Sequence, residues 1–226
     1  MKILVFAPHA DDEILGCGGT IARYVAEGAE VHVCIVTNLY PPLGDDSEAK
    51  ENGWPINLYP EAMGAKKTLG IKEYHFLLFP AVILETVPRY EFNGKIQELI
   101  TRIEPDVVFI PHFGDMQKDH TLTSEAVMVA VRPKVKHIVQ SVYAYETLSE
   151  TEWNIPHTRN VFIPNVYIDI SKFVEKKLNA MSCYKSQLGK FPDPRSLEAV
   201  EALAKYRGST SCHGYAEAFM LIREYK

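Results

Sequence analysis

The sequence has few cysteines, and they are not clustered. Four occur in 226 residues, at Cys17, Cys34, Cys183 and Cys212, and no two have the spacing of a CxxC motif. Clustered cysteines are typical of structural zinc sites and redox centres, so the sequence indicates neither. We expect two of the four to lie in core elements, and all of them to be reduced thiols of a cytoplasmic protein.

Long hydrophobic runs and an excess of basic residues are also missing. No apolar run approaches the roughly 20 residues of a membrane span, and Met1-Lys2 leads directly into a strand-like segment, so we expect neither a span nor a signal peptide. The net charge is −5 and the Lys and Arg residues are scattered, which excludes the charge pattern of a nucleic-acid-binding protein. The composition is that of a globular enzyme, and the length predicts one domain over residues 1–226.

Strand-like and helix-like segments alternate along the chain. The predicted strands are residues 3–7, 31–36, 74–79, 107–110, 138–145 and 166–170. The predicted helices are residues 14–27, 60–69, 92–103, 121–131, 172–181 with Ser171 as its N-cap, and 197–205, and a further segment, 215–223, follows. This order predicts an α/β fold, a three-layer sandwich with a mostly parallel sheet and helices on both faces.

Three loops leave the carboxyl ends of predicted strands, at residues 8–13, 37–57 and 111–120. In a doubly wound sheet such loops converge on one crevice. The first and third of them carry His9, Asp11, Asp12, His112, Asp115, Asp119 and His120. Two histidines and one carboxylate leave positions on a metal ion open, which suits a catalytic site. Because Asp11 and Asp12 are neighbours, we expect one to bind metal and the other to reach the attacking water.

Each of these motifs has a simpler explanation when taken alone. Asp11 and Asp12 precede a helix, where acidic residues stabilise the helix dipole. The glycines at 16–19 lack the GxGxxG spacing, so close packing of helix on sheet is favoured over a nucleotide-binding loop. His32 and His75 lie in strand-like runs, and we expect them to be structural. The hypothesis of a metal site rests on two such loops recurring after strands in one chain.

Together, Pro8-His9-Ala10-Asp11-Asp12-Glu13, the segment 16–20 and Asp119-His120 resemble the PIG-L/LmbE-like family of zinc-dependent N-deacetylases. The opening motif of that family is written (A/P)-H-P-D-D-E. The resemblance continues at Gly114-Asp115, Tyr145-Glu146, Arg207-Gly208 and residues 215–219. It implies a Rossmann-like sheet and removal of acetyl from an N-acetylglucosamine-type sugar, free or linked to a nucleotide, lipid or small glycoside.

The resemblance also implies roles for individual residues. His9, Asp12 and His120 would bind Zn²⁺, and Asp11 would be the general base. Asp119 would orient a residue that binds the metal. The implied partner is a small N-acetylated amino sugar, with no nucleic acid and no membrane; self-association into a homo-oligomer is left open.

Three positions depart from the family pattern. Ala10 replaces the proline of the motif. Gln117 stands where many members carry a histidine that stabilises the oxyanion; its amide can donate a hydrogen bond but brings no positive charge. His112 and His213 are the alternatives for that role. Pro80-Ala81-Val82 follows the third strand, where many members carry an Asp-Gly pair whose aspartate contacts substrate.

Other residues have both a possible functional role and a structural explanation. Glu146 follows a strand and is a candidate for substrate contact, or else an exposed or paired carboxylate. Arg207 is a candidate for binding a phosphate or sugar hydroxyl, or else part of a structural ion pair. Tyr40, Trp54 and Tyr59 either line a sugar site or pack the long loop.

The sequence therefore predicts a zinc-dependent hydrolase that cleaves the acetamide of an amino sugar, with Asp11 as base and then acid and Gln117 near the oxyanion. Two alternatives remain at this point. A ferrous-iron enzyme can use the same two-histidine, one-carboxylate site. A non-catalytic module that binds a sugar or nucleotide would need no base at Asp11.

Overall fold

The computed structural model describes residues 1–39, 58–134 and 137–226. Within these residues, one sheet has the strand order β3-β2-β1-β4-β5-β7-β6. Its strands are β1 (Lys2–Ala7), β2 (Glu30–Leu39), β3 (Glu73–Pro80), β4 (Val107–Pro111), β5 (Ser141–Tyr145), β6 (Val166–Asp169) and β7 (Ala216–Glu224). Pairing is parallel from β3 through β5, while β7 runs antiparallel to both β5 and β6. The predicted α/β fold with a mostly parallel sheet is confirmed.

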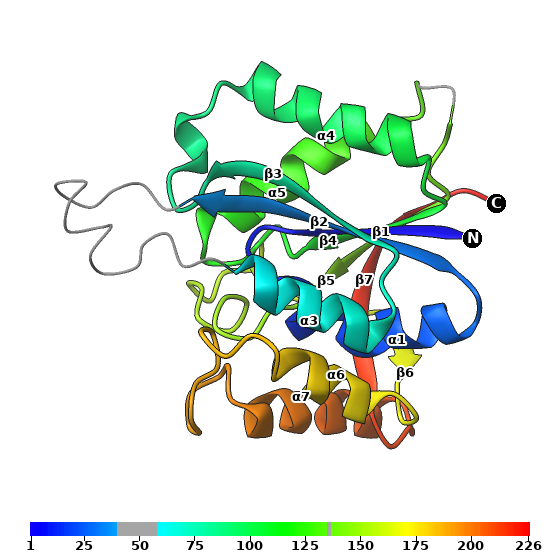
Figure 1. Ribbon diagram of the computed structural model, residues 1–226, viewed down its shortest axis with the longest axis vertical. Helices are drawn as coiled ribbons and strands as arrows, with labels where there is room; N and C mark the ends of the chain where they lie inside the picture. The colour runs from blue at the N-terminus through cyan, green and yellow to red at the C-terminus, as the bar shows by residue number, and fades with distance from the viewer. Residues whose placement is uncertain (40–57, 135–136) are drawn as a thin grey trace, which may run out of the picture.

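Helices cover both faces of the sheet, as predicted. Figure 1 shows α4 (Arg89–Ile103) and α5 (Lys118–Ala130) on one face, and α1 (Asp12–Ala26), α3 (Tyr59–Leu69), α6 (Val174–Met181) and α7 (Leu197–Thr210) on the other. A short 3-10 helix, η1 (Leu84–Thr86), precedes α4. Among the described helices, none has the length and apolar character that crossing a membrane requires.

The alternation of side chains along β1 explains why its sequence is apolar throughout. Ile3, Val5 and Ala7 belong to the core under α1 and α3, whereas Leu4 and Phe6 belong to the core under α4 and α5. A strand covered on both faces needs apolar residues at every position, which is the pattern of a central parallel strand. The central position of β1 places its carboxyl end in the middle of the sheet edge.

Ser171 does not cap α6, contrary to the prediction. Its backbone N–H and its hydroxyl both donate to Oδ1 of Asp169, at 2.9 and 2.6 Å. Helix α6 begins later, at Val174, with Phe173 at the N-cap. A short polar side chain forms whichever local bond its neighbours offer, and here the carboxylate at the end of β6 is closer than the helix amides.

Gly16 allows α1 to lie close against β5. A Cβ atom at this position would stand 2.2 Å from Cδ2 of Tyr145. Tyr145 is itself buried and fixed, because its hydroxyl donates to the carbonyl of Phe6 at 2.8 Å. The glycine-rich segment therefore serves packing of helix on sheet, as predicted, and this packing seats the first turn of α1 at the strand ends.

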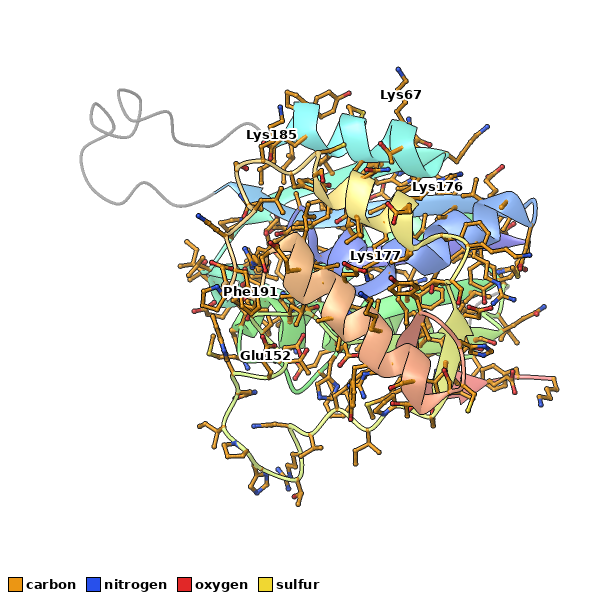
Figure 2. All side chains as sticks on the ribbon, turned by 90° about the horizontal axis from the view of Figure 1, so that it is seen from below. Lys67, Glu152, Lys176, Lys177, Lys185 and Phe191 are labelled. Atoms are coloured by element: carbon orange, nitrogen blue, oxygen red, sulfur yellow. The ribbon has the colours of Figure 1, made fainter. Side chains whose placement is uncertain are left out.

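A buried ion pair ties α1 to the C-terminal part of the chain. Glu217 on β7 accepts hydrogen bonds from the backbone N–H groups of Gly19 and Thr20, at 2.9 and 2.7 Å. The Nζ of Lys177 on α6 donates to Glu217 at 2.5 Å and to the carbonyl of Leu15 at 2.7 Å. Figure 2 shows Lys177 over the middle of the molecule, between α6 and α7 in this view. Both charged groups are buried, so each one needs the opposite charge of the other to offset its loss of hydration.

We expect Lys177→Met to lower the free energy of unfolding by about 3–5 kcal/mol, because the Glu217 carboxylate would stay buried without its cation. Lys176→Met is the matched control: Lys176 is the exposed neighbour on the same helix, and its loss should change stability by less than about 0.5 kcal/mol. Urea unfolding followed by circular dichroism measures both. Equal stabilities of the two variants would contradict a role for the ion pair.

Candidate metal centre

The two predicted strand-end loops meet at the carboxyl ends of β1 and β4, which pair directly. His9 and Asp12 follow β1, and His120 lies in the first turn of α5 after β4. Their potential ligand atoms all lie within 4.8 Å of one another. The Oδ2 of Asp12 is 3.4 Å from Nδ1 of His9 and 3.2 Å from Nε2 of His120. The structure thus brings together the three residues predicted as metal ligands.

The atoms of this group fit a metal ion. Asp12 Oδ1 and His120 Nε2 are buried and have no hydrogen-bond partner among the described residues. Buried polar atoms without partners are rare in folded proteins, and a bound ion is one of the few explanations for them. Two imidazole nitrogens and one carboxylate oxygen form a donor set typical of a catalytic zinc site, with further coordination positions open to water or substrate.

Each histidine of the group is held by a carboxylate on its other nitrogen. The Nε2 of His9 is 3.0 Å from Oδ2 of Asp119, and the Nδ1 of His120 is 2.8 Å from Oδ2 of Asp115. Such contacts fix the tautomer of an imidazole ligand and direct its free nitrogen at the metal. Asp119 lies next to His120 in sequence, yet it contacts the histidine of the other loop.

The sequence pattern indicates no separate role for Asp115, although this residue lies in one of the predicted strand-end loops. Its Oδ1 also accepts a hydrogen bond from the hydroxyl of Thr151, at 2.6 Å, so the carboxylate is held from both sides. A signal was present: Asp115 stands five residues before His120. At that spacing, across the start of a helix, nothing in the sequence says which aspartate faces which ring.

The carboxylates around the two histidines create a negatively charged environment. Burial opposes charging of His9, but its hydrogen bonds to Asp119 and Asp12 outweigh that effect and raise its pKa to about 9. Burial likewise lowers the pKa of His120, but Asp12 and Asp115 raise it well above the usual range. The imidazolium groups in turn hold the pKa of Asp12 well below its usual range despite burial. An environment that draws protons onto imidazoles also favours a divalent cation.

Asp11 is separated from Asp12 by a sharp turn of the backbone. Its φ angle is 121°, in the region that favours glycine, which is uncommon for a residue with a side chain. While Asp12 faces the histidines, Asp11 Oδ2 lies 3.6 Å from Nη1 of Arg195. Neither carboxylate oxygen of Asp11 has a hydrogen-bond partner in the described part of the chain. Burial raises the pKa of Asp11 to about 8, with Arg195 acting against it.

Glu13 holds this turn in place. Its Oε2 accepts a hydrogen bond from the backbone N–H of Asp11 at 3.1 Å, and its Oε1 accepts from the hydroxyls of Tyr74 and Tyr184 at 2.8 and 2.6 Å. Burial raises the pKa of Glu13 to about 7, although both tyrosine hydrogen bonds lower it. Strained residues persist where their surroundings impose the conformation, and Glu13 supplies that restraint.

The three candidates for the oxyanion position lie in different places. Gln117 is the N-cap of α5: its Oε1 accepts from the backbone N–H of Asp119, and its Nε2 is 3.4 Å from Nε2 of His9. His112 is buried, with Nε2 3.0 Å from the carbonyl of Asn160. His213 lies beside Asp169, 4.0 Å away. Of the three, Gln117 is the one that contacts a histidine of the group.

Glu146 and Arg207 pair with each other. Arg207 donates from Nε and Nη2 to the two carboxylate oxygens of Glu146, at 2.8 and 2.6 Å. The pair lines a cavity of about 370 Å³ between α7 and the segment that follows β5. Tyr59 is half exposed, with its ring 5.5 Å from that of Phe76. Tyr40 and Trp54 lie outside the described residues.

A second histidine pair lies near the amino ends of β2 and β3. His32 Nδ1 is 3.0 Å from His75 Nε2, and His32 Nε2 is 2.9 Å from a carboxylate oxygen of Glu30. Arg102, which can only donate, is 3.3 Å from Nδ1 of His75. A chain of hydrogen bonds from Arg102 through both rings to Glu30 therefore accounts for these contacts, in line with the structural role expected for the two histidines.

Comparisons with known proteins define the class of this chain as a hydrolase of amide bonds. The family model described as GlcNAc-PI de-N-acetylase, PIG-L, matches residues 4–131, and the chain belongs to this family. Diacetylchitobiose deacetylase of Thermococcus kodakarensis is 26% identical over 98% of this chain and 83% of its own length. A probable N-acetyl-alpha-D-glucosaminyl L-malate deacetylase 2 of Bacillus anthracis is 27% identical over 82% of this chain and 80% of its own.

A solved structure agrees with the fold over the whole length. The conserved protein TT1542 of Thermus thermophilus superposes with a TM-score of 0.77 and 30% identity, covering 99% of this chain and 96% of that one. The family resemblance expected from the opening motif is thus confirmed, and so is the expectation of an enzyme of the deacetylase class.

We expect Asp115→Asn to weaken zinc binding by about 10- to 100-fold, because the imidazole of His120 would lose the carboxylate that orients it. Competition with a chelating dye measures the affinity. Asp169→Asn is the control, since that carboxylate binds Ser171 away from the group. An Asp115→Asn protein that binds zinc as tightly as the parent would show that Asp115 does not support the ligand.

Proposed function

We propose that this protein is a zinc-dependent hydrolase that removes the N-acetyl group of an N-acetylglucosamine-type sugar, free or linked to a nucleotide, lipid or small glycoside, and releases acetate. The observation that carries the proposal is the buried group of His9, Asp12 and His120 with Asp11 beside it, in a chain of the de-N-acetylase family. The names of the relatives, which refer to diacetylchitobiose and to glucosaminyl malate, support the sugar class.

His9, Asp12 and His120 would hold the zinc ion. The chemistry that zinc supplies when bound is Lewis acidity, which lowers the pKa of water from about 15.7 to about 7 and polarises a carbonyl oxygen. The assignment of zinc rests on the two nitrogen donors, because ions such as Mg²⁺ favour oxygen ligands alone.

Asp11 is proposed as the general base and then the general acid. It takes a proton from the water whose oxygen attacks the acetyl carbon, and it gives that proton to the nitrogen as the C–N bond breaks. Amine and acetate are the products. The buried carboxylate of Asp11, whose oxygens have no hydrogen-bond partner among the described residues, suits both transfers, because a carboxylate accepts a proton and the resulting carboxylic acid donates it.

Three other predicted site residues have proposed roles in binding the substrate or stabilising the developing charge. Gln117 would donate from its amide to the negative charge that develops on the acetyl oxygen, because it stands where many members of the family carry the histidine for this role. Glu146 and Arg207 would contact the part of the substrate that reaches the cavity they line. The compartment proposed is the cytoplasm, because all four cysteines are free thiols.

Incubation of the protein with N-acetylglucosamine, N,N′-diacetylchitobiose and nucleotide-linked N-acetylglucosamine tests the function. We expect acetate release from at least one of them, loss of that activity with a chelator, and its return on addition of Zn²⁺. Acetate is measured by a coupled enzymatic assay. Activity restored only by Fe²⁺ together with oxygen consumption would favour the ferrous-iron alternative, and sugar binding without acetate release would favour a binding module.

We expect Asp11→Asn to lower kcat by about 10²–10⁴-fold while zinc content stays at that of the parent, because the amide cannot accept the proton of water. Metal content is measured by atomic emission and kcat by acetate release. An Asp11→Asn protein with parental kcat would exclude Asp11 as the base. Retained zinc separates this result from the loss of metal that His120→Ala should cause.

A further inference from the structure

Glu150 lies against the metal centre although it is distant from it in sequence. Its backbone carbonyl accepts a hydrogen bond from the N–H of Met116, next to Asp115, at 3.2 Å. The following residue, Thr151, donates its hydroxyl to Asp115 itself. The charges of His120, Asp12 and His9 all affect the pKa of Glu150, which burial raises. The turn at Glu150 therefore packs on the loop that carries His120.

The side chain of Glu150 is buried but not fully satisfied. The residue is 7% exposed, and its Oε2 finds no hydrogen-bond partner anywhere in residues 1–39, 58–134 or 137–226. Its Oε1 is 3.7 Å from Nη2 of Arg195, longer than a hydrogen bond. A buried carboxylate oxygen without a donor is unfavourable by itself, so a ligand that brings a donor would relieve it.

Arg195 connects Glu150 to Asp11. Its Nε donates to the hydroxyl of Ser149 at 2.9 Å and its Nη1 to the side-chain carbonyl of Gln187 at 3.4 Å, which fixes the plane of the guanidinium. The two terminal nitrogens then face different carboxylates, with Nη1 3.6 Å from Asp11 and Nη2 3.7 Å from Glu150. The base and the unsatisfied carboxylate thus border the same cation.

We propose that Glu150, positioned by Arg195, binds a hydroxyl group of the sugar whose acetamide is cleaved. This inference rests on the proposed function and names the contact that holds the sugar ring. A sugar hydroxyl can donate to Oε2 of Glu150, the buried oxygen that has no donor among the described residues. A cationic ligand suits the place less, because Arg195 already supplies the positive charge.

Few other described groups near the metal centre could bind a sugar hydroxyl. The end of β3 and the residues after it, Pro80-Ala81-Val82, have no polar side chain, and the N–H of Val82 donates to Asp119 at 2.7 Å. Glu146 is bound at both oxygens by Arg207. Asp11, Asp12 and Asp119 also have oxygens without donors, but they are the proposed base, a proposed metal ligand and the support of His9. Glu150 has such an oxygen and none of these roles, and it faces a side of Arg195 distinct from that facing Asp11.

The test compares sugar binding by the zinc-loaded parent protein, Glu150→Gln and Glu175→Gln. Glu175 is exposed in the first turn of α6, so its variant makes the same change of charge away from the centre and from the cavity beside Glu146. Titration calorimetry with N-acetylglucosamine and N,N′-diacetylchitobiose gives Kd. We expect Glu150→Gln to raise Kd by about tenfold or more, and Glu175→Gln to raise it by less than about twofold.

Two further measurements make the result specific. Arg195→Lys keeps the charge but loses the planar fork, and it should also raise Kd several-fold if it positions Glu150. Among the 3-deoxy, 4-deoxy and 6-deoxy forms of N-acetylglucosamine, one should bind the parent and Glu150→Gln equally, because it lacks the hydroxyl concerned. Thermal unfolding of each variant checks that the fold is retained.

Unchanged Kd in Glu150→Gln, equal effects of Glu150→Gln and Glu175→Gln, or no binding of either sugar by the parent would each overturn the inference. Acetate release is measured separately on the parent protein. Acetate release by the parent together with unchanged Kd in Glu150→Gln would refute the role of Glu150 and leave the deacetylase function standing. Sugar binding that depends on Glu150, without acetate release by the parent, would support the role of Glu150 and refute the deacetylase function.

Discussion

The parallel pairing of β1 with β4 is the constraint on which the rest of the site depends. Leu4 pairs with Val108 in the middle of the sheet, so the loops after Ala7 and after Pro111 leave it side by side. Without that adjacency, His9 and Asp12 would have no route to His120, which lies more than a hundred residues further along the chain. The pairing is stable because β1 is apolar on both faces and is covered by helices on each side.

The part of the chain that follows β5 supports this arrangement from outside the parallel strands. Strand β7 returns antiparallel between β5 and β6 and brings Glu217 to the backbone of α1, where Lys177 meets it. The turn after β5 brings Thr151 to Asp115, and the segment before α7 brings Arg195 to Asp11. The proposed metal-binding residues all lie within the first 120 residues, whereas Thr151 and Arg195, which contact the groups around them, come from the later part of the chain.

The contrast between predicted and observed features follows this division. His9, Asp12 and His120 could be found from the sequence, because a short motif after a strand carries its own location. The sequence predicts that Asp119 orients a metal-binding residue, and its contact with His9 in the structure depends on how two loops meet. Glu150 and Arg195 carry no local signal at all. Ser171 shows that a local signal can also mislead. The sequence predicts it as the N-cap of a helix, but its hydroxyl donates to the nearer carboxylate of Asp169.

The backbone at Asp11 has a consequence for how this chain can vary. A φ of 121° is easier for glycine than for aspartate, so the chain holds a less stable residue at this position and needs Glu13, Tyr74 and Tyr184 to keep it there. Selection for stability alone would drive this site toward glycine. Aspartate persists here only while something other than folding demands its carboxylate, so stability and chemistry pull this one position in opposite directions.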